Sequence, residues 1–118
     1  MLQLAHKNLE VYKISIDLVK EVYLVTKRFP KEEQYSLVNQ LRRAIVSVCS
    51  NLAEGSSRFS KAEKKRFYEV SRSSLVEVDT QLEIACMLQY LQKSEIIELE
   101  KHLESVFKML SKMIGNLQ

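Results

Sequence analysis

The chain has 118 residues, of which 46% are hydrophobic and 28% charged, and its formal net charge is +3. This length suits one folded domain spanning residues 1–118, and the composition excludes a disordered chain. Only two glycines and one proline are present, which leaves too few turn residues for an all-β fold and favours long helices. No apolar run approaches the roughly 18 residues of a membrane span, and no secretory signal opens the chain. We therefore expect a cytoplasmic protein that does not enter a membrane.

The first predicted helix spans about Leu9 to Arg28 and carries two apolar stripes. One stripe contains Val11, Ile14, Leu18, Val22 and Val25, and the other, offset by one residue, contains Tyr12, Ile16, Val19 and Tyr23. A face this wide indicates either a helix buried deeply within the monomer or a second face that packs on another subunit. We favour the second interpretation, because a small bundle has little interior in which to bury a whole helix. The second stripe is thus the predicted oligomer interface.

The second predicted helix begins after Phe29-Pro30, because proline cannot sit inside a helix and restricts the residue before it. Its apolar positions are Val38, Leu41, Ile45, Val48 and Leu52, a repeat of 3.5 residues. Such a repeat forms the seam of a left-handed bundle. Gly55 is expected to end this helix in the left-handed conformation of a C-cap.

The third and fourth predicted helices complete a bundle. Ser60 and Glu63 form a predicted capping box, and the third helix then continues without a breaker as far as Leu91. Its stripe is Phe67, Ser71, Ser74, Val78, Leu82, Ala85 and Leu88. The fourth helix is expected to start at a Ser94 cap, to end at Gly115, and to bury Ile96, Leu99, Leu103, Val106, Leu110, Met113 and Leu117. Short connections make sequential helices antiparallel, so the sequence predicts an all-α, up-down-up-down four-helix bundle.

The residues that usually carry catalysis or metal binding are sparse. The chain has no Glu-x-x-His step, and its two histidines, His6 and His102, are isolated. It also has neither a nucleophile elbow nor a glycine-rich phosphate loop. Cys49 and Cys86 lie among small or apolar neighbours, which favours reduced core residues over a disulfide or a reactive thiol. We therefore expect no enzymatic activity, no metal site and no cofactor.

A polar stripe runs beside the apolar one on the second and third helices. The predicted polar network contains Gln40, Arg43, Asn51, Glu54, Ser74 and Glu77. If the hairpin folds about residues 58 and 59, Arg43 lies near Ser74 and is expected to reach Glu77. The stripe is interpreted either as a partly buried network that fixes helix register or joins subunits, or as a groove for a ligand.

The charges are separated along the chain. Residues 39–72 contain eight basic and three acidic side chains, whereas residues 75–104 contain seven acidic and two basic ones. The predicted nucleic-acid contacts are Arg58, Lys61, Lys64, Lys65, Arg66 and Arg72, with Phe59 as an aromatic neighbour. A basic run of this kind is either a solvated helix face or a phosphate-binding surface. In a ring of like subunits the basic ends would repeat and produce a large positive field.

Several motifs resemble one known family. They are Leu9-x-Val11-Tyr12, Phe29-Pro30, the EQYSL of residues 33–37, the QLRRA of residues 40–44, Ser47, the NLAEG of residues 51–55, Arg58, Phe67, Ser74, Glu77 and the TQL of residues 80–82. Their order and spacing resemble the 23S rRNA intervening-sequence protein family, also called the S23-like four-helix bundle family. The likeness extends over nearly the whole chain.

The resemblance implies a cytoplasmic bacterial protein, an antiparallel four-helix bundle and a ring-like homo-oligomer, expected to be a pentamer. A related branch of proteins accompanies diversity-generating retroelements, partners a reverse transcriptase and binds nucleic acid. We therefore expect a non-enzymatic, oligomeric accessory protein that binds nucleic acid, RNA rather than DNA. One alternative is a scaffold that docks an acidic protein partner such as a reverse transcriptase, and a third hypothesis is a bundle that binds a small molecule at the polar stripe.

Overall fold

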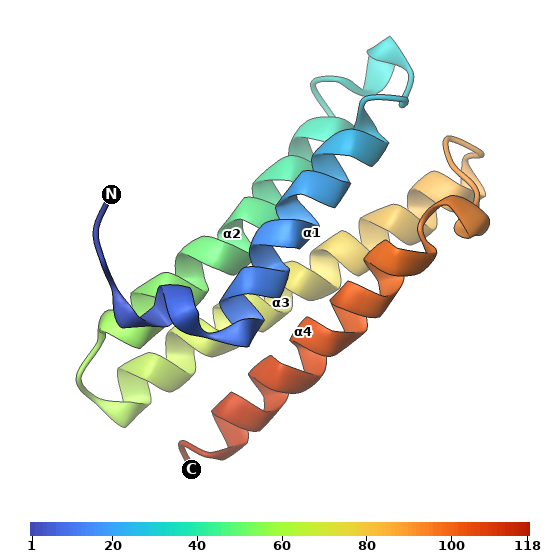
Figure 1. Ribbon diagram of the computed structural model, residues 1–118. Helices are drawn as coiled ribbons and strands as arrows, with labels where there is room; N and C mark the ends of the chain where they lie inside the picture. Colours follow the sequence, from blue (N-terminus) through green and yellow to red (C-terminus); the bar gives the residue numbers. More distant parts are fainter.

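Four long helices run alternately up and down in the computed structural model, which describes residues 1–118 (Figure 1). They are α1 (Glu10–Thr26), α2 (Leu37–Ser57), α3 (Lys61–Met87) and α4 (Ile97–Gly115), with short 3-10 helices η1 (Ala5–Asn8), η2 (Lys31–Glu33) and η3 (Lys93–Glu95). Each helix packs on the next along the chain, and α4 returns to pack on α1. The prediction of an all-α, antiparallel four-helix bundle is therefore confirmed. None of the helices combines the length and apolar character that crossing a bilayer requires.

The two ends of the bundle are built differently. The α2–α3 junction and both chain termini lie at one end, and the α1–α2 and α3–α4 connections lie at the other (Figure 1). These two connections are longer than predicted. The prediction that the third helix continues to Leu91 was wrong, because α3 ends at Met87, and α2 and α4 begin only at Leu37 and Ile97, after η2 and η3. Ser94 does not cap α4 as predicted; the capping box belongs to η3, where Gln92 and Glu95 bond reciprocally.

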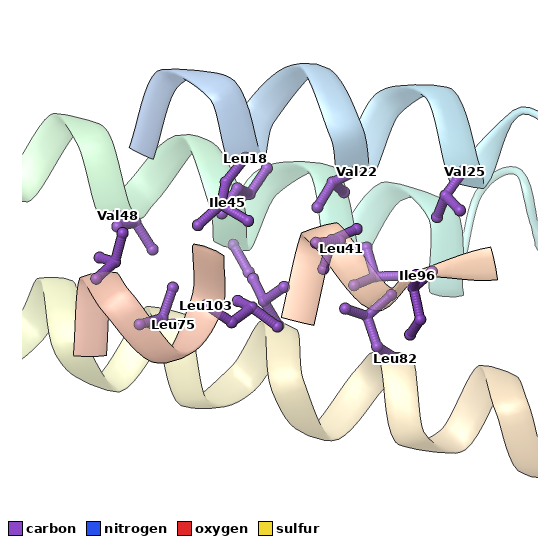
Figure 2. Packing of buried hydrophobic residues seen from close by; sticks show 14 of the residues in the cluster. Leu18, Val22, Val25, Leu41, Ile45, Val48, Leu75, Leu82, Ile96 and Leu103 are labelled. Carbon is purple, nitrogen blue, oxygen red and sulfur yellow. The ribbon is translucent and has the colours of Figure 1, made fainter. Parts of the chain in front are cut away.

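The core is formed by one apolar face of each helix. Figure 2 shows side chains from all four helices directed into the same interior, including Leu18, Leu41, Leu82 and Leu103. All five positions predicted for the second helix are buried, and so are the first five of the fourth. Near the end of α4, Met113 is only half-buried and Ile114 faces the interior instead. A helix with 3.6 residues per turn drifts away from a 3.5-residue repeat, which accounts for this exchange.

Gly55 has a different role from the predicted one. It does not adopt positive φ, and α2 continues past it to Ser57. Instead, a Cβ atom at Gly55 would lie 2.7 Å from Cε1 and 2.8 Å from Cδ1 of Tyr68 on α3. The prediction of a left-handed C-cap was wrong, because glycine here permits close approach between two helices rather than a chain reversal.

The second stripe of α1 lies at the edge of the core. Tyr12, Ile16 and Val19 are half-buried, and Tyr23 is 37% exposed. The His6 ring of η1 packs edge-on against Tyr12 with 4.8 Å between centroids, and the Arg42 guanidinium lies 4.4 Å from the Tyr23 ring centroid. The monomer thus covers part of this stripe and leaves the rest accessible.

Candidate nucleic-acid interface

The α2–α3 junction is a tight turn with an exposed aromatic at its tip. Only Arg58, Phe59 and Ser60 separate α2 from α3. The Ser60 hydroxyl accepts a hydrogen bond from the backbone N–H of Glu63 at 3.1 Å and thereby caps α3. This is one half of the predicted capping box, and the return bond from the Ser60 N–H to the Glu63 side chain is absent. Phe59 is fully exposed. The turn therefore holds an aromatic ring in solvent between two helix ends.

Two of the predicted basic residues are engaged in holding this turn. An amine of the Arg58 guanidinium lies 3.2 Å from a Glu54 carboxylate oxygen, and the group stacks 4.8 Å from the Phe67 ring centroid. The Lys64 ammonium donates to the carbonyl oxygens of Gly55 and Ser56 at 3.4 and 3.2 Å. These carbonyls belong to the last turn of α2, where the helix dipole favours a cation. Arg58 and Lys64 therefore have structural partners of their own.

Arg72 lies away from the junction. Its guanidinium donates to the Ser111 hydroxyl of α4 at 3.0 Å and sits 5.8 Å from the Phe107 ring centroid. The structure thus places Arg72 on the α3–α4 flank, where it does not join the other predicted basic residues.

The remaining three cations have no acidic partner. Lys61 and Arg66 are exposed and Lys65 is half-buried, and no carboxylate lies within ion-pair distance of any of them. Lys61 and Lys65 are one helical turn apart on α3, and the Arg66 guanidinium lies 5.6 Å from the Phe67 ring centroid. We call these three cations and Phe59 the junction surface: three cations without an acidic partner in the first turns of α3, and one exposed aromatic ring in the turn before them.

The predicted polar network is present in part and is shifted by one helical turn. The hydroxyls of Ser47 and Ser74 are 2.9 Å apart, and Asn51 donates to the Ser47 hydroxyl and carbonyl at 2.9 Å. Gln81 donates to Gln40 at 3.3 Å. These bonds place Ser74 opposite Ser47 rather than opposite Arg43, and Glu54 turns instead to the junction.

The expected Arg43–Glu77 ion pair is absent. Both side chains are exposed, and they line a shallow groove of about 320 Å³ between α2 and α3 without meeting. The pair was predicted on the assumption that the hairpin turns at residues 58 and 59. In the structure Ser74 lies opposite Ser47 and Gln81 opposite Gln40, so this assumption was wrong. This correction leaves Arg43 without an ion-pair partner.

Comparison with known proteins places the chain in a family. The family model described as 23S rRNA-intervening sequence protein matches residues 7–112. The chain belongs to this family. The match covers α1, α2, α3 and most of α4, so the resemblance expected from the sequence motifs is confirmed over most of the chain. Among curated proteins, no sequence matches this one significantly.

A solved structure has the same fold as this chain. It is the crystal structure of a protein with unknown function from the S23 ribosomal protein family of Bacteroides thetaiotaomicron. The two chains superpose with a TM-score of 0.78 at 16% identity, over 88% of this chain and 97% of the other. At this identity the likeness concerns the fold alone.

The family member described here has no clustered metal ligands. No group of three or more His, Cys, Asp or Glu side chains could hold a metal ion. The two thiols are free, and burial raises the pKa of Cys49 to about 11. His102 contacts Glu21 across α1 and α4 at 2.6 Å, a single interhelical contact. The junction surface therefore remains the strongest candidate for a functional site.

Proposed function

We propose that this protein is a non-enzymatic, oligomeric accessory protein of the cytoplasm that binds nucleic acid, preferentially RNA, through the junction surface. The observation that carries the proposal is that Lys61, Lys65 and Arg66 lack any acidic partner in the first turns of α3, directly after the fully exposed Phe59. A phosphate backbone supplies the missing negative charge and releases its condensed counterions on binding. An exposed aromatic face offers a stacking platform to an unpaired base of any identity.

Two considerations favour RNA and several subunits. The description of the family names an intervening sequence of 23S rRNA, so RNA is the first ligand to test. Three cations form a small surface for one monomer, and an oligomer that repeats them on one side multiplies the contacts. The partly exposed stripe of Tyr12, Ile16, Val19 and Tyr23 offers apolar surface for such an assembly.

The experiment is fluorescence anisotropy with single-stranded and duplex RNA over a series of salt concentrations. Changing Lys61, Lys65 and Arg66 together to Gln should weaken binding to any sequence. It should also reduce the slope of log affinity against log salt by roughly two to three units, at about 0.7–0.9 per lost phosphate contact. The matched control changes Lys27, Lys31 and Lys101, three exposed lysines outside the junction, to Gln, and should retain most of the affinity.

Phe59→Ala separates stacking from charge. We expect it to weaken single-stranded RNA binding by about 5- to 100-fold, as loss of one stacked base does, without altering the salt slope. Binding to duplex RNA should change little, because paired bases offer no free face. If the wild-type protein binds no RNA at low salt, the proposal is wrong, and the junction surface then suits an acidic protein partner.

A further inference from the structure

The flank formed by α3 and α4 carries a groove with an apolar floor and an acidic rim. Leu75 and Leu103 form the floor, and the partly exposed Val76 and Phe107 flank it, in a volume of about 310 Å³. The carboxylates on the rim belong to Asp79, Glu100 and Glu104. We call this the acidic groove.

The acidic groove is poorly neutralised within the monomer. Asp79 and Glu100 have no cation within ion-pair distance, whereas Glu104 pairs with Lys108 on its own helix at 2.8 Å. Toward η3 the groove continues past Glu83, and Lys93 is the only cation lining that part. At the opposite end it borders Phe107 and the guanidinium of Arg72. The groove thus presents apolar surface and two free carboxylates to solvent.

The flank formed by α1 and α2 has the complementary character. Its groove of about 670 Å³ is lined by Tyr23, Asn39, Arg42, Arg43, Val46 and Ser50 among others, with no carboxylate. Arg42 is held by the Thr26 hydroxyl at 3.0 Å and the Tyr23 carbonyl at 3.3 Å. Arg43 is exposed and unpaired, and Tyr23 and Val46 are 37% and 41% exposed. We call this the arginine groove.

The two grooves belong to opposite flanks of the bundle, because α1 packs on α2 along one flank and α3 packs on α4 along the other (Figure 1). The α2–α3 bonds Ser47–Ser74 and Gln40–Gln81 set Arg42 and Arg43 level with Asp79. The α3–α4 bond between Arg72 and Ser111 sets Asp79 level with Glu104. A neighbouring copy that points in the same direction can therefore present one groove to the other without sliding along the bundle axis.

We infer that the acidic groove binds the arginine groove of a second copy of this chain, in a head-to-tail contact between parallel bundles. Arg43 then meets Asp79 and Glu100, and Tyr23 and Val46 cover Val76 and Phe107. Such a contact is heterologous, so each copy keeps one free groove for the next. Because all copies point the same way, every junction surface lies on one side of the assembly. The inference rests on the oligomeric part of the proposed function and assigns its surfaces.

The test uses charge reversal and light scattering in the absence of RNA. Changing Asp79 and Glu100 to Lys should weaken self-association by about 10- to 100-fold, because like charges then oppose each other. Arg43→Glu should do the same from the other side. The matched control reverses Glu69 and Glu98, two exposed acids outside both grooves, and should assemble like the wild type. Circular dichroism checks that every variant retains its helices.

Mixing distinguishes this contact from any symmetric one. The Asp79→Lys/Glu100→Lys variant keeps its arginine groove, and the neutral variant Arg43→Gln keeps its acidic groove. Arg43→Gln replaces Arg43→Glu in the mixture, because a negative charge at position 43 would attract the new lysines at positions 79 and 100 and rebuild the second contact. Their mixture should give a one-to-one dimer of about twice the 13.8 kDa chain mass and nothing larger. If wild type and all variants assemble alike, the assigned surfaces are wrong while oligomerisation stands. If the wild type itself is a monomer, this inference and the oligomeric part of the proposed function fail together, and RNA binding is judged separately by anisotropy.

Discussion

The two ends of the bundle use their charged residues in opposite ways. At the end that holds the α1–α2 and α3–α4 connections, charged side chains tie one loop to another. Glu33 accepts from the Tyr90 hydroxyl at 2.7 Å and from the Ser36 hydroxyl at 2.6 Å. Arg28 at the end of α1 pairs with Glu95 of η3. The Tyr90–Glu33 and Arg28–Glu95 contacts join segments far apart in the sequence, so they fix how the helix pairs meet.

The α2–α3 end shows the reverse. Its turn is already short, and Arg58 and Lys64 suffice to close it. Lys61, Lys65 and Arg66 add positive charge without any acidic partner within the chain. The charged residues at the end with the two long connections are therefore explained by folding. Most of the positive charge at the α2–α3 end has no role in folding that the structure reveals.

The largest expected effect on stability comes from Gly55→Ala at the α2–α3 end. The new Cβ atom would overlap the Tyr68 ring at 2.7 Å and approach Phe67 Cβ at 3.1 Å. Overpacking of this kind costs about 1–3 kcal/mol, more than the roughly 0.5–1 kcal/mol that alanine gains in helix propensity. Urea unfolding should show a clear net loss. Gly115→Ala is the matched control, since nothing lies within 4 Å of its Cβ position; an equal loss there would contradict the packing argument.

Gly55 also marks the limit of what the sequence can predict. The periodic stripes predicted the four helices and most of the core, because burial of one helix face follows directly from residue spacing. The partner of Gly55 lies on another helix, and spacing along one helix carries no information about it. The same reason explains the register error. Ser47–Ser74 and Gln40–Gln81 centre the hairpin on Ser60 and Lys61, not on residues 58 and 59.

The sequence predicted that basic residues gather near the α2–α3 junction, but not which of them are available to a ligand. The run of basic residues stands out in the sequence, but the structure shows that its members have different partners. Lys64 and Arg58 bond to the turn, Arg72 bonds to α4, and the other three cations have no acidic partner. The i, i+4 spacing of Glu54 and Arg58 is a recognisable helix pattern. The bonds of Lys64 and Arg72 depend on the position of a carbonyl or a hydroxyl on another helix, which no sequence pattern gives. The acidic and arginine grooves were likewise hidden, since each combines residues from two helices.

A smaller effect is expected from Tyr90→Phe at the loop end. Hydrogen bonds from Ser36 and from Tyr90 lower the pKa of Glu33 from its ordinary value of 4.5. A carboxyl group whose pKa is lowered by folding stabilises the protein above its unfolded pKa, and this contribution disappears as the pH falls through the folded pKa. Tyr90→Phe should therefore lower the melting temperature near neutral pH. Its difference from wild type should shrink below about pH 4, and a difference that is constant with pH would exclude Glu33 as its source.

The smallest expected effect on stability concerns the lysines at the start of α3. A charge of the favourable sign at a helix end stabilises the helix by about 0.3–1 kcal/mol. Lysines in the first turns have the unfavourable sign, so each should destabilise the helix by about a few tenths of a kcal/mol. Lys61→Gln with Lys65→Gln should therefore leave the urea midpoint unchanged or raise it slightly. Lys64→Gln should lower the midpoint, because it removes a cation that donates to the Gly55 and Ser56 carbonyls at the end of α2. Neighbouring lysines of one helix would then respond with opposite signs. If the double variant loses as much stability as Lys64→Gln, Lys61 and Lys65 stabilise the fold. Their positive charge would then be explained by folding and would no longer be evidence for a bound ligand.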